Sequence, residues 1–293
     1  MNKYFYYGLK DDFNWSDEQF KVVLSDHLEA LDILCFLTNT MFEKKIKDLH
    51  YKYYSESLAF KYVYQSLNLN SILNGTRHIS EIFNFDTIVF DISSSYIMQR
   101  SLFETYLTFY YLYIQPTDEN ECRCKWLIYQ IAGLNSRQDF TSNYIDYKSK
   151  IENEKETIKQ CIEELKCNEY FLSLPEGKQK DILNRKQAKI LGWEKLFTSS
   201  DLKSDLFVRS WRLYSNYAHS EYISLIQFKE YNQDSYELIS TKQLVAFSSL
   251  ILTAVFVVNM KKLYKEIEEN FSKLSDEQKD CINFLSNIGK KSS

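Results

Sequence analysis

Glycine and proline are scarce in this chain of 293 residues, which contains only six glycines and two prolines. Sheet proteins use both residues at their many turns, so this scarcity favours long helices over a sandwich or a barrel. Aromatic residues are plentiful at 16%, which supplies side chains for a sizeable core. We therefore predict an all-α fold, a single helical bundle of roughly seven to nine helices.

Several motifs of catalysis are also missing. The sequence has no Gly-rich phosphate loop, HExxH motif or nucleophile elbow, which argues against classical NTPases, zinc proteases and α/β-hydrolases. The six cysteines form no CxxC pair and no regular framework, so we expect free thiols in a reducing cytoplasm. We predict neither a metal nor a cofactor.

Positive charge is not in excess, because the net charge is −4. A global electrostatic grip on nucleic acid is therefore absent, and any such binding must be local. One local basic run does occur, in a short segment that follows Pro175. A solvated helix face explains it most simply, and an RNA- or partner-binding patch is the alternative. The residues concerned are Lys178, Lys180, Arg185, Lys186 and Lys189.

The N-terminus lacks the architecture of a signal peptide. The segment 244–260 is apolar, but Ser248, Ser249 and Thr253 interrupt it. At about 17 residues it lies at the bottom of the length range that spans a bilayer. We predict a buried central helix, no membrane association and a cytoplasmic location.

Helical spacing of apolar residues divides the rest of the chain into segments. N-terminal helices are expected within 16–67, with an N-cap at Ser16 and with His27 on the apolar face as a core histidine. A loop follows at 68–80, and a long helix over 86–115 ends before Pro116. Further helices are predicted at 118–140, 143–167, 241–274 and 275–288, with an extended connector at 222–228.

The segment 143–167 repeats apolar residues every seven positions at Tyr144, Ile151, Ile158 and Leu165. This pattern predicts an arm that packs along a narrow seam. An ordinary solvated helix of the bundle fits equally well. No Pro-, Gly- or Ser-rich linker divides the chain, so we predict a single domain with its core at about 85–260.

Two charged residues lie among apolar neighbours in the helix at 86–115. Arg100 and Glu104 are four residues apart, so they share one helix face and can form an ion pair. The neighbouring residues in the sequence include Ile97, Leu102 and Phe103. A salt bridge on the protein surface rarely has so many apolar neighbours. A partly buried pair needs further partners, and Arg212 or His219 could supply them.

The helix capped by Ser200 and Asp201 and ending near Glu221 carries the most informative residues. Arg212 and His219 are seven residues apart, nearly two full turns, so both side chains point to one side. Ser215 and Asn216 fall between them. An arginine can hold a phosphate while a histidine titrates near neutral pH, so this face has the minimal chemistry for phosphoryl reactions.

Arg212 and His219, with six residues between them, resemble the Arg-(four to six)-His signature of the HEPN superfamily. The segments Arg100-Ser-Leu-Phe-Glu104 and Tyr214-Ser-Asn-Tyr-Ala-His219 are also similar to a large uncharacterised bacterial family with an Arg…Glu helix and a Tyr-x-x-Ser-x-x-x-His-like helix. The resemblance covers about 85–260. It implies an all-α HEPN-like core with extra helices, of a kind common in bacterial toxin–antitoxin and phage-defence systems.

What the resemblance implies for function is metal-independent ribonuclease chemistry. His219 would transfer a proton, Arg212 would hold the scissile phosphate, and Asn216 or Ser215 would orient the reacting groups. In this interpretation Arg100, Glu104 and Tyr214 would hold these residues in position without contacting the substrate. Expected partners are RNA, a cognate inhibitor protein and a second copy of the chain in a homodimer.

Two alternatives remain open at this stage. Arg100, Glu104 and His219 could form a buried polar knot that only ties two helices together, or the face could sense a ligand or partner protein. A knot predicts a buried, unreachable His219, whereas an enzyme predicts a solvent-accessible one.

Overall fold

The computed structural model describes residues 16–43, 53–138, 145–185, 187–202, 204–230 and 236–290. In these residues the protein is predominantly helical, with thirteen α-helices, one π-helical turn and a two-stranded sheet. The prediction of a helical protein is confirmed. The predicted number of helices was too low, because two expected long helices are interrupted and several short helices occur between residues 169 and 230.

Packing divides the chain into two compact units. Unit 1 comprises Met1–Phe109 and Phe197–Ser293, and unit 2 comprises Tyr110–Leu196. The single-domain interpretation stays a prediction, because two compact units can belong to one folding domain.

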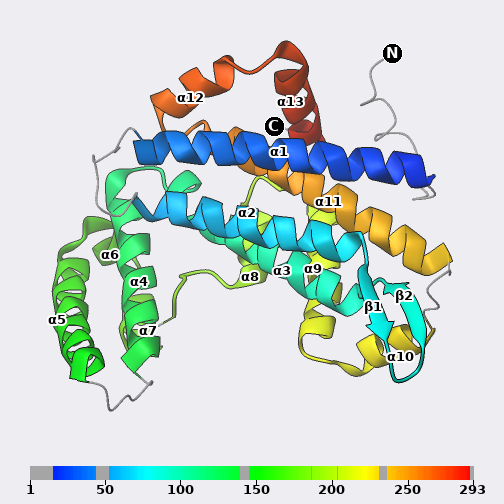
Figure 1. Cartoon of the computed structure of the whole chain (residues 1–293). Coiled ribbons are helices and arrows are strands. Elements are labelled where there is room, and N and C mark those ends of the chain that lie inside the picture. Colours follow the sequence, from blue (N-terminus) through cyan, green and yellow to red (C-terminus); the bar gives the residue numbers. More distant parts are fainter. Residues whose placement is uncertain are drawn as a thin grey trace. The chain divides into compact units, whose positions relative to one another are not determined.

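Unit 1 is built around the apolar helix α11, which packs against α1, α2, α3 and α13 (Figure 1). Helix α9 packs on α3 and α10 on α9, while α12 packs on α1. The elements of unit 1 are α1 (Asp17–Glu43), α2 (Tyr53–Leu73), β1 (Thr76–Ser80), β2 (Phe85–Val89), α3 (Ile92–Phe109), α9 (Ser204–Ala218), α10 (Tyr222–Glu230), α11 (Tyr236–Met260), α12 (Lys265–Ser272) and α13 (Asp276–Gly289).

Helix α11 is apolar on all sides, as a helix surrounded by others must be. Within Leu238–Met260, an 18-residue window has a mean hydropathy of 1.9, and 89% of that window is buried inside the protein. By length and composition alone this helix could cross a membrane. Its burial is what the core helix of a helical bundle shows, as predicted for 244–260.

Buried hydrogen bonds cross the middle of unit 1. His27 of α1 contacts the Asn70 side chain through Nδ1 (2.9 Å) and Thr253 Oγ1 through Nε2 (3.1 Å). Tyr62 of α2 shares the same Thr253 hydroxyl at 3.0 Å. Gln99 of α3 bonds both Ser248 and Ser249 of α11. These bonds join α1, α2, α3 and α11, and they confirm His27 as a satisfied core histidine.

Three predicted elements of unit 1 differ from the structure. The expected helix at 241–274 is two helices, because i→i+3 hydrogen bonds after Met260 tighten and end α11. The expected connector at 222–228 is the helix α10, in which tertiary packing on α9 and α3 outweighs the β-branched composition. Asp201 does not cap α9, which begins at Ser204; its carboxylate instead accepts hydrogen bonds from Tyr106 and Asn259.

The largest departure is a β-hairpin between α2 and α3. Strands β1 and β2 pair antiparallel from Thr76 opposite Val89 to Ser80 opposite Phe85. Of the expected loop at 68–80, residues 68–73 continue α2 and 76–80 form β1, while the start of the expected helix at 86–115 lies in β2. Gly75, with φ of +86°, ends α2 and permits the turn into β1.

Unit 2 is a smaller helical assembly with its own apolar core. Its elements are the π-helical turn η3 (Tyr110–Ile114), α4 (Glu119–Gln138), α5 (Ile145–Cys167), α6 (Glu169–Ser173), α7 (Glu176–Arg185) and the first part of α8 (Trp193–Ser199). Ile158 and Leu165 of the seven-residue repeat are buried against α4. Helix α5 therefore packs along a seam rather than protruding alone; Tyr144 lies outside the described residues.

Candidate functional site

Helix α3 positions the first two site residues. The Arg100 Nε group donates to Glu104 Oε1 at 2.9 Å, and the two side chains are 19% and 27% exposed. On either side of Arg100, Gln99 is buried and Ser101 is bonded to Gln65 of α2. The ion pair thus lies at the edge of the core, on a helix face that is fixed by its neighbours.

His219 is placed by the end of α9. The His219 backbone N–H donates to the Ser215 carbonyl, and two further bonds follow from Ser220 to Tyr217 and from Glu221 to Asn216. This pair of 5→2 and 6→1 bonds is a Schellman motif, in which His219 is the C-cap. Ser220 occupies the left-handed position at φ of +52°, which normally favours glycine.

The two helices bring Arg100 and His219 into contact. Arg100 Nη1 lies 3.2 Å from His219 Nε2. Because a guanidinium only donates, Nε2 accepts this hydrogen bond, and the neutral ring then carries its proton on Nδ1. The predicted convergence of Arg100, Glu104 and His219 is confirmed, and His219 is exposed rather than buried. A fully buried polar knot therefore does not occur at this place.

The remaining residues of the predicted face lie on α9 itself. Arg212 is exposed, and helix geometry puts it about 10 Å along the axis from His219 on the same side. Ser215 donates its hydroxyl to the Trp211 carbonyl at 2.8 Å, so it is bonded within the helix. Asn216 is half-buried.

Tyr214 points into the core rather than to the site face. Its ring stacks on Phe103 of α3 at a centroid distance of 6.0 Å and packs on Tyr96 at 4.5 Å. Burial raises the pKa of its phenol to about 12. Tyr214 therefore fixes α9 on α3 and supports the Arg100–His219 contact indirectly.

The basic residues after Pro175 belong to unit 2. Lys180 is exposed and Lys178 half-buried on α7, whereas the Arg185 side chain and Lys186 lie outside the described residues. The Lys189 ammonium lies 4.1 Å from the ring centre of Trp193 and 5.8 Å from that of Tyr129. The loop of Lys189 also lines an open hollow of about 360 Å³ with Trp193.

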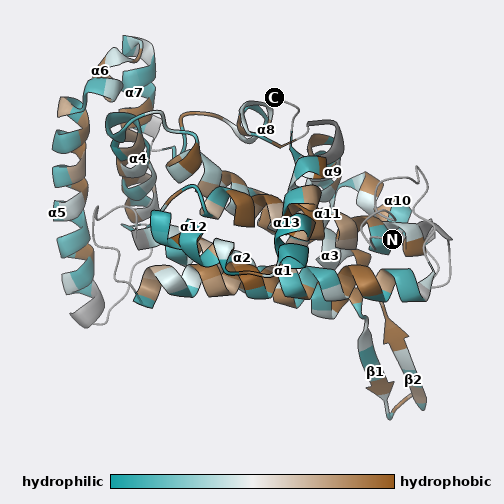
Figure 2. Cartoon of the chain, turned by 90° about the horizontal axis from the view of Figure 1, so that it is seen from above, coloured by the Kyte–Doolittle hydropathy of each residue, from teal (hydrophilic) through white to brown (hydrophobic). Residues whose placement is uncertain are grey.

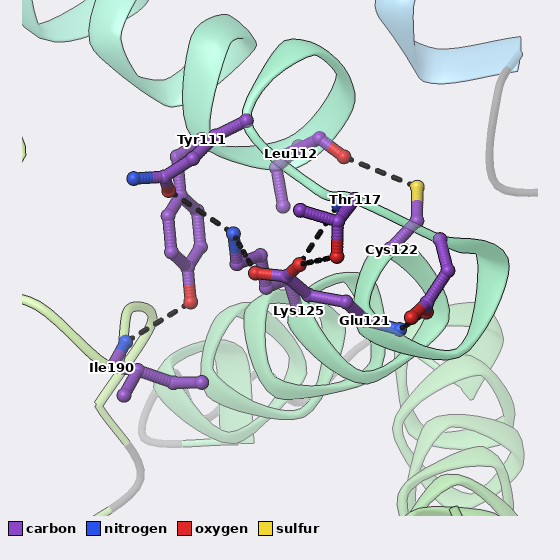
Figure 3. Close-up of polar contacts among 9 residues, drawn as sticks. Tyr111, Leu112, Thr117, Glu121, Cys122, Lys125 and Ile190 are labelled. Carbon is purple, nitrogen blue, oxygen red and sulfur yellow. Dashed lines mark hydrogen bonds and ion pairs between the residues drawn. The ribbon is translucent and has the colours of Figure 1, made fainter. Parts of the chain in front are cut away.

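Unit 2 contains a second charged cluster that the sequence did not reveal (Figure 3). Lys125 contacts Glu121 at 2.7 Å and Gln115 at 3.0 Å, and its ammonium lies over the Tyr111 ring. Glu121 also accepts from the Thr117 backbone and hydroxyl. Each charge is surrounded by partners, so the cluster joins η3 to α4 and offers little to a ligand.

Burial sets the pKa values in this second cluster. It lowers the pKa of Lys125, against the opposing effect of Glu121, and raises the pKa of the nearby Cys124 thiol to about 12. Burial also acts to raise the pKa of Glu121, but hydrogen bonds from Lys125 and Thr117 outweigh it and leave that pKa below its usual value. A protonated thiol and a saturated ion pair indicate a structural role.

Within the described ranges, no group of three or more His, Cys, Asp or Glu side chains is placed to hold a metal ion. All six cysteines are free thiols. No protein-family model, curated protein or solved structure matches the chain, so the resemblance to the HEPN superfamily stays a prediction.

Proposed function

We propose that the Arg100–His219 cluster is the active site of a metal-independent ribonuclease of the HEPN type. The supporting observation is the exposed His219, whose Nε2 is held as a hydrogen-bond acceptor by the Arg100 guanidinium at 3.2 Å. An unprotonated imidazole nitrogen beside a fixed cation is the combination that base-catalysed attack on a phosphodiester requires.

Arg100 has a more direct role in this proposal than the sequence suggested. Its guanidinium has five N–H donors, of which Nε serves Glu104 and one N–H of Nη1 serves His219. It therefore retains donors for a phosphate oxygen. Glu104 fixes the orientation of the guanidinium, and Arg212, on the same side of α9, binds a neighbouring phosphate of the strand.

Cleavage follows when a phosphate replaces His219 on Arg100. The freed Nε2 takes the proton of the ribose 2′-hydroxyl, and the 2′-oxygen attacks phosphorus. The bond between phosphorus and the 5′-oxygen breaks, and the leaving oxygen takes a proton from water. The products are a 2′,3′-cyclic phosphate and a 5′-hydroxyl, and no metal takes part.

The direct experiment incubates the purified full chain with end-labelled single-stranded RNA in excess EDTA. We expect fragments that end in 2′,3′-cyclic phosphate, and we expect His219→Ala, Arg100→Lys and Arg212→Ala to abolish or strongly slow their formation. Arg209→Ala is the matched control, because Arg209 is also exposed on α9. RNA that stays intact with and without added metal would refute the proposal.

The cellular role proposed with this activity is that of a toxin in a bacterial stress or phage-defence system, acting in the cytoplasm under the control of an inhibitor protein. Expression of the chain without an inhibitor should slow growth of the host, and His219→Ala should restore it. Intact RNA together with tight, His219-dependent RNA binding would instead favour a ligand-sensing role for the same face.

A further inference from the structure

The end of α13 places one lysine among polar groups at the edge of the core of unit 1. Lys290 is the C-cap of α13, and its backbone N–H donates to the Ser286 carbonyl at 3.0 Å. The same residue pairs with Leu202 in an isolated antiparallel bridge. These contacts hold the backbone from which the side chain extends, so the fold restricts where the Lys290 amine can lie.

The groups around the Lys290 amine hold it only loosely. Its Nζ lies 3.4 Å from Asn259 Oδ1 and 3.7 Å from Asp201 Oδ2, whereas a charged hydrogen bond is usually about 2.7–2.9 Å long. The Asp201 carboxylate already accepts hydrogen bonds from the Tyr106 hydroxyl at 2.7 Å and from the Asn259 amide at 2.9 Å. Asp201 is thus a distant and shared counter-ion for Lys290, whose side chain is 17% exposed.

Two more lysines lie near this amine, where the apolar helix α11 ends. Lys261 and Lys262 directly follow Met260, and their positive charges disfavour a further charge on Lys290. Figure 2 shows that α11 is largely hydrophobic, whereas α12 and α13 carry many hydrophilic residues. Burial is the main cause that lowers the pKa of Lys290 from 10.5 to about 8; the two lysines add to this effect and Asp201 opposes it.

These surroundings make the Lys290 amine a nucleophile. A lysine attacks electrophiles as the neutral amine, and proteins activate it by removing water and by placing another cation beside it. With a pKa of about 8, about 10% of Lys290 is neutral at pH 7, against about 0.03% of an ordinary lysine. Its partial exposure also gives an electrophile access to the nitrogen.

A lysine of unit 2 shows that a lowered pKa alone does not give this reactivity. Burial also lowers the pKa of Lys125. Its ammonium, however, lies 2.7 Å from Glu121 and 3.0 Å from Gln115, and its side chain is only 4% exposed. We expect Lys125 to be unreactive, because its amine is bonded at short distance and shielded from solvent.

We propose that Lys290 is a site of covalent acylation by acyl thioesters whose carrier bears phosphate groups. The amine nitrogen attacks the acyl carbon, the bond between that carbon and sulfur breaks, and the proton that the nitrogen loses goes to the leaving thiolate. The products are an N-acyl lysine and a free thiol. Lys261 and Lys262 favour an anionic carrier, because two cations beside the amine attract phosphates.

The modification alters the contacts at the end of α13. Acylation removes the positive charge that faces Asp201 and leaves this carboxylate less compensated at the edge of the core. We expect faster amide hydrogen exchange at Leu202 and Lys290 in the acylated protein, because the bridge between them is held beside the lost ion pair. The site does not depend on the proposed ribonuclease activity.

The test incubates the folded full chain with acetyl-coenzyme A at neutral pH, without a transferase, and follows each acetylated lysine by peptide mass spectrometry. Fragment ions separate Lys290 from the neighbouring Lys291. We expect Lys290 to react at least about tenfold faster than Lys279, a smaller factor than the gain in neutral amine because a less basic amine is a weaker nucleophile. Lys279 is the matched reference, because it is 27% exposed but paired with Asp276 at 2.8 Å.

Two further measurements separate the effect of the fold from the chemistry of lysine in general. The rate at Lys290 should level off above about pH 8, where its amine is neutral, whereas the rate at Lys279 should keep rising. In concentrated urea the two rates should converge, because unfolding exposes both amines to water.

The choice of carrier is tested by the double variant Lys261→Gln/Lys262→Gln. It should slow acetylation of Lys290 by acetyl-coenzyme A up to about fivefold more than acetylation by uncharged p-nitrophenyl acetate, the worth of an exposed charge pair. Lys265→Gln is the control, because Lys265 is exposed on α12 and its ammonium lies 3.8 Å from Glu269.

Three results would overturn acylation at Lys290. These are a rate no higher than that at Lys279, a rate that keeps rising with pH as at Lys279, and a preference for Lys290 that survives in urea. Equal slowing with both acetyl donors in the double variant would refute the phosphate-bearing carrier.

Discussion

Two histidines of unit 1 lie in opposite environments. His27 is fully buried, and both ring nitrogens are bonded to side chains of other helices. His219 is exposed at the end of α9, and its Nε2 contacts the Arg100 guanidinium. The same side chain thus joins helices in one place and meets solvent beside a cation in the other. His27 therefore contributes to the stability of the fold, whereas the imidazole of His219 is accessible to a ligand.

The largest expected effect concerns activity at the exposed histidine. His219→Ala should slow RNA cleavage by about 10²–10⁴-fold, the usual contribution of a general base. Its free energy of unfolding should change by less than about 1 kcal/mol, because the side chain is exposed. Cleavage rates and urea unfolding of the same preparation test both parts. A large loss of stability would show that His219 resembles His27 after all.

The reverse behaviour is expected of the buried histidine. His27→Ala leaves a cavity and removes the partners of Asn70 and Thr253, so it should lower the free energy of unfolding by about 3–4 kcal/mol. RNA cleavage by the fraction that remains folded should be unchanged. Cleavage normalised to the folded fraction by circular dichroism tests this, and a specific loss of activity would contradict a purely structural His27.

Acid should reveal the burial of His27. Burial lowers its pKa from 6.5 to about 4, against the weaker effect of the Asn70 hydrogen bond. Between these values the unfolded chain binds a proton that the folded chain does not, so stability is lost as the pH falls from about 6.5 to 4. The loss is about 3 kcal/mol. In His27→Gln the decrease in stability between pH 7 and 4.5 should be smaller by about 2.5 kcal/mol.

The smallest effect concerns the turn that holds His219. Ser220→Gly relieves a left-handed backbone conformation and should raise the free energy of unfolding by about 1 kcal/mol. Ser215→Gly, in the interior of the same helix, should lower it by about 0.5–1 kcal/mol. Thermal unfolding of the two variants compares them directly, and equal signs would argue against strain at Ser220.

The sequence predicted the contact among Arg100, Glu104 and His219, and it predicted a helical fold but fewer of its details. Arg100 and Glu104 were recognisable because an i,i+4 charged pair among apolar residues needs a partner, and His219 supplies it. The left-handed conformation of Ser220 could not be predicted from the sequence, because serine is not typical of that conformation. Gln99, which anchors α3 to α11, was hidden because a buried glutamine shows no periodic pattern.

The hairpin and the helix boundaries were missed for related reasons. Phe85–Val89 is too short for its hydrophobic period to separate a strand from a helix, and the predicted helix at 86–115 includes most of it. The Asn74–Gly75 pair is typical of a loop, whereas here it ends α2 and leads directly into β1. Helix α11 ends without a glycine or proline, so nothing in composition marks its boundary with α12.

The position of His219 as the C-cap of α9 ties the site to the motion of a helix end. Terminal turns open and close far more often than helix interiors, on timescales much shorter than global unfolding. When the last turn of α9 opens, the backbone hydrogen bonds of Ser220 and Glu221 break. We expect the contact between the His219 imidazole and Arg100 to be lost at the same time. Amide hydrogen exchange at Ser220 and Glu221 therefore reports how often the contact between Arg100 and His219 opens. A ligand that bridges Arg100 and His219 should slow that exchange without changing it in α11.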